Sequence, residues 1–177
     1  TGGPDDGSAE ILHRLSTTLD ALKINHGITM RLILPVGNHR QEQLRARLGP
    51  DQSVSWRIQP DDFSTNTVET IRHRQTAALS IAAPNGAMAV LPDDPGLYEL
   101  RYNGALIGAV WNTDISGERR RTRVSLTSTA AKTASARTPF GLWSFWSPKG
   151  GTDLWILRDH TGFEADPSEP SRASWFT

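Results

Sequence analysis

Hydrophobic residues near the start of the chain recur every three to four positions, which is the period of an amphipathic helix. Ser8 is a residue type favoured at a helix N-terminus, and Gly27 follows His26 where the pattern stops. The hydrophobic residues of this stretch are Ile11, Leu15, Leu19 and Leu22. The pattern predicts a lead-in and one helix as a first unit, residues 1–27.

The period changes to two after Gly27, and this predicts a strand with one buried face over residues 28–36. The expected buried residues are Ile28, Met30, Leu32, Leu34 and Val36. Asn38 and Gln41 then resemble a capping box, so a short extra helix is expected over residues 39–48, before Gly49 and Pro50.

From Ser53 onward, alternation and turn signals predict closely spaced strands, about eight or nine with the first. Expected strands are 53–59, 70–83 (with Ala77, Leu79, Ile81 and Ala83 on one face), 87–91, 97–102, 105–113, 124–128, and a last pair, 140–146 and 154–157. Asn85-Gly86 and Asn103-Gly104 are two-residue hairpin signals.

These elements together predict a mainly β chain. The expected fold is a two-sheet antiparallel sandwich over residues 28–162, either a jelly roll or immunoglobulin-like, with an N-terminal helix and one short extra helix. Residues 163–177 are rich in Pro and Ser and are expected to form an irregular C-terminal tail.

Composition excludes several chemistries. The 177 residues contain no cysteine, which excludes disulfides, thiolate metal sites and a Cys nucleophile. Because 19 Lys and Arg face 19 Asp and Glu, nucleic acid is not an expected partner. No apolar run approaches the ~20 residues of a membrane span.

No catalytic, metal or cofactor site is expected. The five histidines are scattered without ligand spacing, so neither a metal nor another cofactor is predicted. One alternative remains open, a hydrolase that uses His160 with Asp159 or Asp153. Without a nucleophile motif, the sequence favours a protein that is not an enzyme.

A dense basic run extends from Glu118 to Arg123. Arg119, Arg120 and Arg121 could bind an acidic partner, because guanidinium groups form paired hydrogen bonds with carboxylates. The other interpretation is a solvated hairpin tip that protects a sheet edge.

Aromatic residues gather in the last third of the chain. Trp143 and Phe145 share one face of the expected strand 140–146, and Trp146 lies on the other, so both faces carry large apolar groups. Core packing, an interface with other chains and a sugar-stacking platform all fit this pattern. Trp175 and Phe176 end the tail and are expected to pack on a neighbouring surface, in this chain or in another copy.

The segment Asp94-Pro95-Gly96-Leu97-Tyr98 resembles the corner before strand F of immunoglobulin-like domains, with Leu100 where that family has a Cys. The resemblance implies a tyrosine corner. Tyr98 should be largely buried, and its hydroxyl should bond to the backbone close to Asp94.

The sequence therefore favours a non-catalytic structural or interaction domain that associates with other protein subunits, above all with copies of itself. Such a chain could build a shell, a virion or a surface protein, and a secreted or virion component is favoured over a cytoplasmic one. The alternatives are a carbohydrate- or ligand-recognition module that uses exposed Trp, and the hydrolase.

Overall fold

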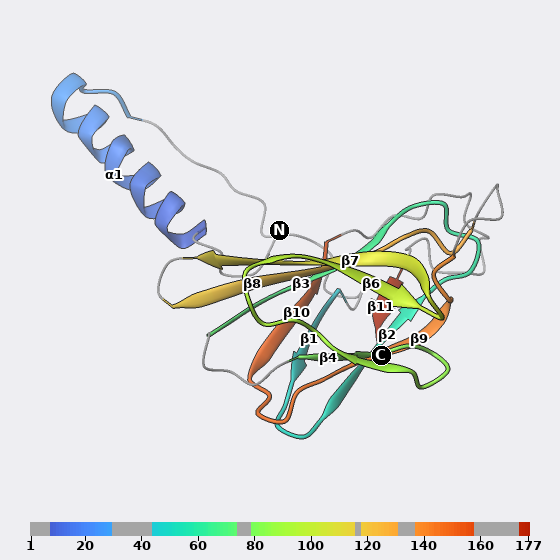
Figure 1. Cartoon of the computed structure of the whole chain (residues 1–177). Coiled ribbons are helices and arrows are strands. Elements are labelled where there is room, and N and C mark those ends of the chain that lie inside the picture. The colour runs from blue at the N-terminus through green and yellow to red at the C-terminus, as the bar shows by residue number, and fades with distance from the viewer. Residues whose placement is uncertain (1–7, 30–43, 74–78, 116–117, 131–136, 158–173) are drawn as a thin grey trace.

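Two packed antiparallel sheets form the body of the protein, with one helix to the side (Figure 1). The computed structural model describes residues 8–29, 44–73, 79–115, 118–130, 137–157 and 174–177. The elements are α1 (Ser8–His26), β1 (Arg45–Leu48), β2 (Ser53–Ile58), β3 (Asn66–His73), β4 (Ser80–Ala82), β5 (Met88–Val90), β6 (Gly96–Tyr102), β7 (Ala105–Ile115), β8 (Arg119–Leu126), β9 (Gly141–Trp146), β10 (Thr152–Ile156) and β11 (Ser174–Phe176).

The strand order is that of a jelly roll. The six-stranded sheet has the order β1-β10-β3-β8-β7-β6, and the five-stranded sheet has the order β11-β2-β9-β4-β5. When the β6–β7 hairpin and β11 are set aside, eight strands remain. They pair from the outside of the sequence inward, as β1 with β10, β2 with β9, β3 with β8 and β4 with β5. This is the pairing of one long hairpin rolled into two sheets. The predicted mainly β, two-sheet sandwich is therefore confirmed.

The core lies between the sheets, and every second side chain along strands such as β2, β8 and β10 points into it. In the five-stranded sheet, the rings of Trp56 and Phe145 stack with centroids 5.7 Å apart and planes inclined by 28°. Buried apolar residues of the facing sheet belong to the same hydrophobic cluster, among them Leu48, Val68 and Leu154. Burial of these side chains supplies the main driving force for folding.

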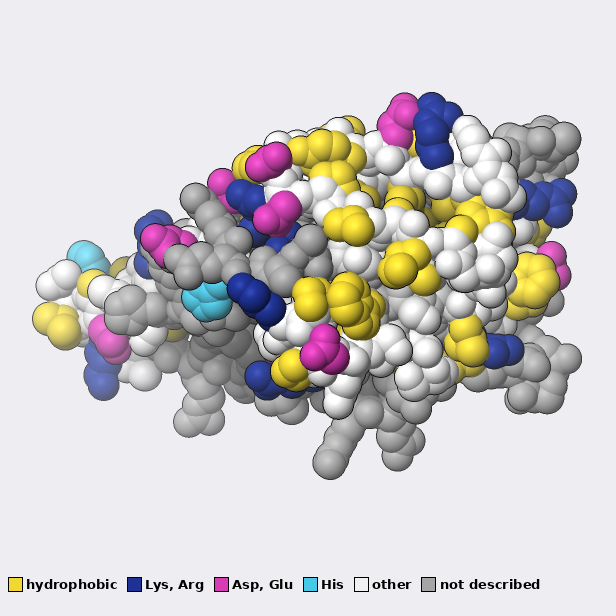
Figure 2. Space-filling model, turned by 60° about the horizontal axis from the view of Figure 1, so that its bottom comes forward, with side chains coloured by type: hydrophobic (Ala, Val, Ile, Leu, Met, Phe, Trp, Pro, Cys, Tyr) yellow, Lys and Arg dark blue, Asp and Glu magenta, His cyan; other side chains and the backbone are white. Residues whose placement is uncertain are grey.

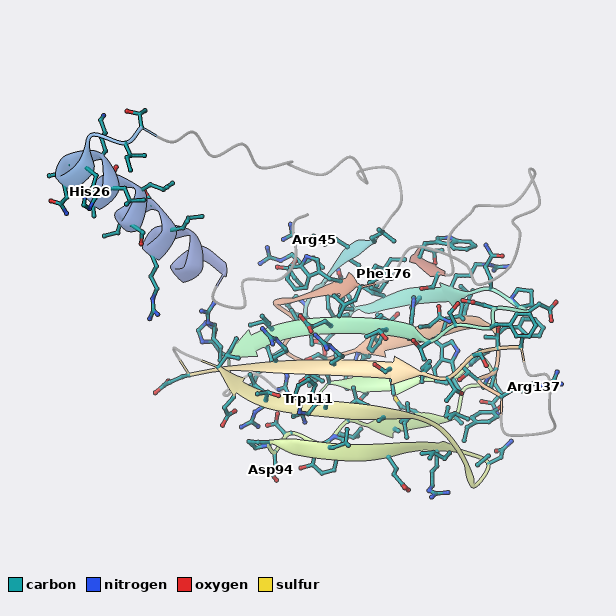
Figure 3. All side chains as sticks on the ribbon, turned by 90° about the horizontal axis from the view of Figure 1, so that it is seen from above. His26, Arg45, Asp94, Trp111, Arg137 and Phe176 are labelled. Atoms are coloured by element: carbon teal, nitrogen blue, oxygen red, sulfur yellow. The ribbon has the colours of Figure 1, made fainter. Side chains whose placement is uncertain are left out.

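The predicted N-terminal helix is confirmed. Gly27 ends it as expected, with a left-handed backbone (φ +66°) and a hydrogen bond from its N–H to the Lys23 carbonyl oxygen (3.0 Å). Figures 1 and 3 both show α1 extending away from the sheets.

The predicted strand over residues 28–36 is wrong at its start. Ile28 is 47% exposed and lies outside any strand, because the chain has just left the helix end at Gly27. Met30, Leu32, Leu34 and Val36 lie outside the described residues.

The short helix predicted over residues 39–48 is also wrong in its second half, since Arg45–Leu48 forms the strand β1. Ala46 is half-buried and Leu48 is fully buried, at a spacing of two, while β10 supplies the backbone hydrogen-bond partners. Good helix formers therefore lie in a strand, because pairing and burial outweigh local propensity. Residues 39–43 lie outside the described part of the chain.

Two expectations about segments that are neighbours in the sequence were wrong, one about a continuous strand and one about a strand pair. The single strand expected over 70–83 is divided, because β3 belongs to the six-stranded sheet and β4 to the other. Of its expected inward residues, Leu79, Ile81 and Ala83 are buried as predicted, and Ala77 lies outside the described residues. The expected last pair is divided in the same way, since β9 pairs with β2 and β4, whereas β10 pairs with β1 and β3. Strands adjacent in sequence cross between sheets in a jelly roll.

Both Asn-Gly pairs lie in hairpins as predicted, joining β4 to β5 and β6 to β7. The first turn is longer than the two residues expected, because the Gly86 N–H bonds to the Ala83 carbonyl oxygen (2.8 Å) and the Ala83 N–H bonds to the Ala87 carbonyl oxygen (2.8 Å). Asn103 and Gly104 have φ of +49° and +80°, the left-handed conformations that such a tight turn requires.

The Tyr98 hydroxyl donates a hydrogen bond to the Asp94 carbonyl oxygen (3.1 Å), with the Pro95 carbonyl oxygen 3.4 Å away. Gly96 (φ +152°) makes room for the ring, because a Cβ there would lie 3.1 Å from the hydroxyl oxygen. The predicted bond is therefore confirmed, although Tyr98 is half-buried instead of largely buried, because β6 is a sheet edge. The wider resemblance to immunoglobulin-like domains stays a prediction.

The end of the predicted irregular tail belongs to the sandwich. Ser174–Phe176 forms β11, which pairs with β2, and Phe176 is only 4% exposed within the hydrophobic core. A hydrogen bond from the Thr177 N–H to the Ser55 carbonyl oxygen extends this pairing (2.9 Å). Phe176 is thus packed in its own chain.

Replacing Phe176 with Ala should lower the free energy of unfolding by about 3 kcal/mol, because it removes a buried ring and leaves a cavity. Thr177→Ala, next to it and exposed, should change stability by less than about 0.5 kcal/mol. Urea unfolding would measure both. Equal stability of the two variants would contradict the placement of β11 in the core.

Tyr98→Phe should cost about 0.5–1.5 kcal/mol, a single hydrogen bond at a position that water can reach. Tyr102→Phe, on the same strand and also half-buried, is the matched control and should cost less. Thermal unfolding of both variants checks this, and a larger loss at Tyr102 would refute the structural role of the corner.

Candidate interaction surfaces

The aromatic strand β9 divides its side chains between core and surface as period two requires. Trp143 and Phe145 are buried, so these two predicted interface residues belong to the core, as Phe176 does. Trp143 also donates its indole N–H to the Pro139 carbonyl oxygen (2.9 Å). Trp146 points to the outside and stays partly exposed.

The outer side of the five-stranded sheet is named here the apolar face. Its members, found from the register, are Trp175, Ser53, Ser55, Arg57, Leu142, Ser144, Trp146, Ser80, Ala82, Met88 and Val90. Arg57 is the single charged side chain among them, and its guanidinium lies 5.9 Å from the centre of the Trp175 ring. Figure 2 shows one face of the molecule with hydrophobic and uncharged side chains through its middle.

The predicted basic run is a strand, not a hairpin tip. Because β8 alternates, Arg119, Arg121 and Arg123 point outward, whereas Arg120 points inward and is buried. The three arginines that were expected to act together are therefore divided between two sides of the sheet.

Arg120 belongs to an ion-pair network at one end of the sandwich. It donates to Asp114 (2.8 Å), and Asp93 lies 3.6 Å away. The hydrogen bond to Asp114 is the main reason why the pKa of the Arg120 guanidinium is raised. Arg72, buried on β3, bonds to the same Asp93 carboxylate. Two buried guanidinium groups therefore converge on one carboxylate.

This network fixes the loop that crosses from the five-stranded sheet to the six-stranded sheet. Asp93 lies in that loop, and the Asn112 side chain donates to the carbonyl oxygens of Pro92 (2.6 Å) and Asp94 (3.1 Å). Tyr98 bonds to the Asp94 carbonyl oxygen as well. The loop is held from β3, β6, β7 and β8 at once.

The outer side of the six-stranded sheet carries one register row that crosses all six strands. Its members are Leu97 (β6), Trp111 (β7), Arg123 (β8), Glu69 (β3), Trp155 (β10) and Arg45 (β1). Together with Arg47, Arg119 and Arg121, which share this outer side, they are named here the Arg/Trp face. Figure 3 looks onto this sheet, with Arg45 toward one edge and Trp111 nearer the other.

Side chains of this row contact one another. Arg123 bonds to Glu69 (2.6 Å), and its guanidinium lies 5.7 Å from the centre of the Trp111 ring. The Arg45 guanidinium lies 5.3 Å from the centre of the Trp155 ring. These cation–π contacts hold both arginines against the sheet.

A shallow depression of about 400 Å³ opens beside Trp111. It is lined by Leu97, Ala109, Trp111, Arg123 and Ser125. Apolar groups therefore meet one guanidinium and one hydroxyl at the surface.

Trp111 and Leu97 were not among the predicted site residues. One signal could have found them. The Asn103-Gly104 turn fixes β6 and β7 as partners, and the alternation of Tyr98, Leu100 and Tyr102 along β6 leaves Leu97 on the opposite face. Glu69 and Trp155, which share the register row of Trp111, lie 42 and 44 residues from it along the chain. No local sequence pattern predicts that these residues come together.

Of the three residues considered for a hydrolase, the structure describes Asp153 alone, and no catalytic arrangement is found around it among the described residues. Asp153 lies on the outer side of β10, 3.4 Å from Arg45, whereas Asp159 and His160 lie outside the described residues. Among the residues that the structure describes, no three His, Asp or Glu side chains form a metal-binding group. In that same part of the chain, α1 is not apolar enough to cross a membrane.

Asp93→Asn should lower the free energy of unfolding by about 2 kcal/mol, because it removes the carboxylate shared by two buried guanidinium groups, while the partial exposure of Asp93 lets water compensate in part. Asp94→Asn makes the same charge change at the neighbouring, more exposed residue and should cost less than about 1 kcal/mol. Denaturant unfolding at neutral pH compares them. Equal losses would show that the network does not depend on Asp93.

Comparisons with known proteins find few matches. No family model matches the chain, and no curated protein matches it. Among solved structures, the chain is similar to the CspB protease of Clostridium perfringens, with a TM-score of 0.48 and 13% sequence identity. The similarity covers 75% of this chain and 26% of that chain, so the chain spans about a quarter of that protease. A likeness this distant bears on neither fold nor function.

Proposed function

We propose that this protein is a non-catalytic interaction domain that associates with copies of itself through the apolar face. The observation that carries the proposal is the chemistry of that face. Large apolar side chains remain exposed on it, with serine and alanine between them and one arginine at its side. Such patches on a folded domain favour contact with another protein surface.

The exposed apolar groups recur across the sheet, with small serine and alanine side chains between them. Val90 and Met88 on β5 are both about two-thirds exposed, at 68% and 67%, and register places Trp146 in the same row as Val90. Leu142 on β9 and Phe140 just before it are also exposed. Covering these groups would remove apolar area from water, which favours association.

The near absence of charged side chains on the apolar face makes a second copy of this chain a suitable partner for it. A contact between two apolar faces would oppose few like charges, because Arg57 is the only charged residue on the outer side of the described strands of this sheet. A twofold contact also uses one patch twice, so no second complementary surface is needed. Growth into a shell, a virion or a surface layer would need a further, different contact.

The edge strand β5 supports the same assignment. Met88–Val90 carries no charge and no proline, and all three residues are exposed. Sheet edges that avoid pairing usually carry lysine, proline or inward charges. This edge carries none of these residues, and its protection is its short length of three residues.

The test is the mass of the protein in solution at about 10–100 µM, with a matched pair of variants. Val90→Glu places a charge on the apolar face and should shift the protein to monomer, since a stable contact buries about 800 Å² per partner and tolerates no unpaired charge. Leu97→Glu makes a similar apolar-to-acid change at a position that is 74% exposed on the other sheet, and it should leave the mass unchanged.

Two results would refute the proposal. One is a wild-type protein that stays monomeric over this concentration range. The other is an equal loss of association in both variants, which would show that the contact does not depend on the apolar face.

A further inference from the structure

We propose that the Arg/Trp face binds an acidic polysaccharide, with carboxylate or sulfate groups on its arginines and sugar rings over its apolar positions. This site lies on the opposite sheet from the apolar face and does not depend on self-association. The inference rests on three features of the face: its charge excess, the placement of its arginines against tryptophan rings, and the depression beside Trp111.

The first feature is charge. On the outer side of β1, β10, β3 and β8, five arginines face two carboxylates, Glu69 and Asp153. The arginines are Arg45, Arg47, Arg119, Arg121 and Arg123. The whole chain is neutral, so this excess is a local property of one face. A polyanion would be attracted to this side of the molecule.

The second feature is the placement of the guanidinium groups. Arg45 and Arg123 lie on one register row, three strands apart, which corresponds to about 14 Å at the usual spacing between strands. Each guanidinium is held near a tryptophan ring, so it loses less side-chain freedom when it binds an anion. Charged groups at intervals along a polymer match this repeated arrangement.

The third feature is the apolar surface between the charges. Trp111 is 46% exposed and forms the depression with Leu97 and Ala109, while Arg123 and Ser125 supply polar groups at its side. The C–H groups on the face of a sugar ring are attracted by the negative face of an aromatic ring. The depression thus combines an apolar contact with a guanidinium whose Nε and Nη2 are bonded to Glu69, so that its remaining nitrogen, Nη1, is the donor for an acidic group.

Other polyanions fit less well. Nucleic-acid affinity depends on neutralising many closely spaced phosphates at once, and the excess on this face is small. An acidic peptide could reach the arginines, but it would lose backbone freedom on binding. Its acidic side chains would also not fill the apolar depression. A polysaccharide with stiff rings uses both kinds of group.

The experiment measures binding of the full chain to defined polymers by affinity electrophoresis and by fluorescence. The probes are polygalacturonate, dextran sulfate, neutral dextran, single-stranded poly(dT) and polyglutamate. Binding is expected to one or both acidic polysaccharides, weaker at higher salt, without binding to neutral dextran.

A matched pair of variants locates the site. Arg45→Gln and Arg57→Gln make the same charge change, and each removes an arginine from a tryptophan ring, but on opposite sheets. Arg45→Gln should weaken binding about threefold to tenfold, and Arg57→Gln should leave it unchanged. Trp111→Ala should weaken it about tenfold. Thermal unfolding confirms that each variant is folded. The mass in solution of Arg45→Gln and Trp111→Ala, both outside the apolar face, should equal that of the wild type, which separates this site from self-association.

Three outcomes would overturn the proposal. The first is that no acidic polysaccharide binds. The second is tighter binding of poly(dT) or polyglutamate, which would assign the face to another class of partner. The third is equal weakening by Arg45→Gln and Arg57→Gln, which would show that binding follows net charge and not this face.

Discussion

Strand register is the constraint on which the core and both outer surfaces depend. A shift of one residue along any strand would exchange its buried and exposed side chains. In β8 such a shift would bring Arg121 and Arg123 between the sheets and expose Val124. The unpaired buried charges would cost far more than the strand pairing gains. The same alternation that fills the core therefore fixes which arginines and tryptophans reach the surface.

Much of the fold follows from local sequence, because period two and tight turns are local properties. The alternation around Trp56 and Trp143 identifies β2 and β9, and Asn103-Gly104 identifies the β6–β7 hairpin. The bond from Tyr98 to the Asp94 carbonyl spans only four residues, so a short motif was enough to predict it. Each of these features is decided by residues close together in the chain.

What local sequence could not show is the pairing of distant segments. Residues 45–48 have good helix formers, yet β10, more than 100 residues later, provides their strand partner. Phe176 looked like the end of a loose tail because β2, its partner, lies far away along the chain. The Arg/Trp face is a similar case, since its row joins six strands drawn from most of the sequence. Only the jelly-roll order brings Trp111 into line with Trp155.

The ion-pair network fixes the end of the edge hairpin at which the proposed binding surface lies. β6 is the last strand of its sheet and would be expected to open more easily than the centre. Here the loop that leads into it is fixed through Asp93 by two buried arginines, and through Asp94 by Tyr98 and Asn112. These contacts lie at the end of the hairpin where Leu97 and Trp111 stand opposite each other. The depression is therefore preorganised, and weakening the network should loosen this end of the Arg/Trp face before it disturbs the apolar face on the other sheet.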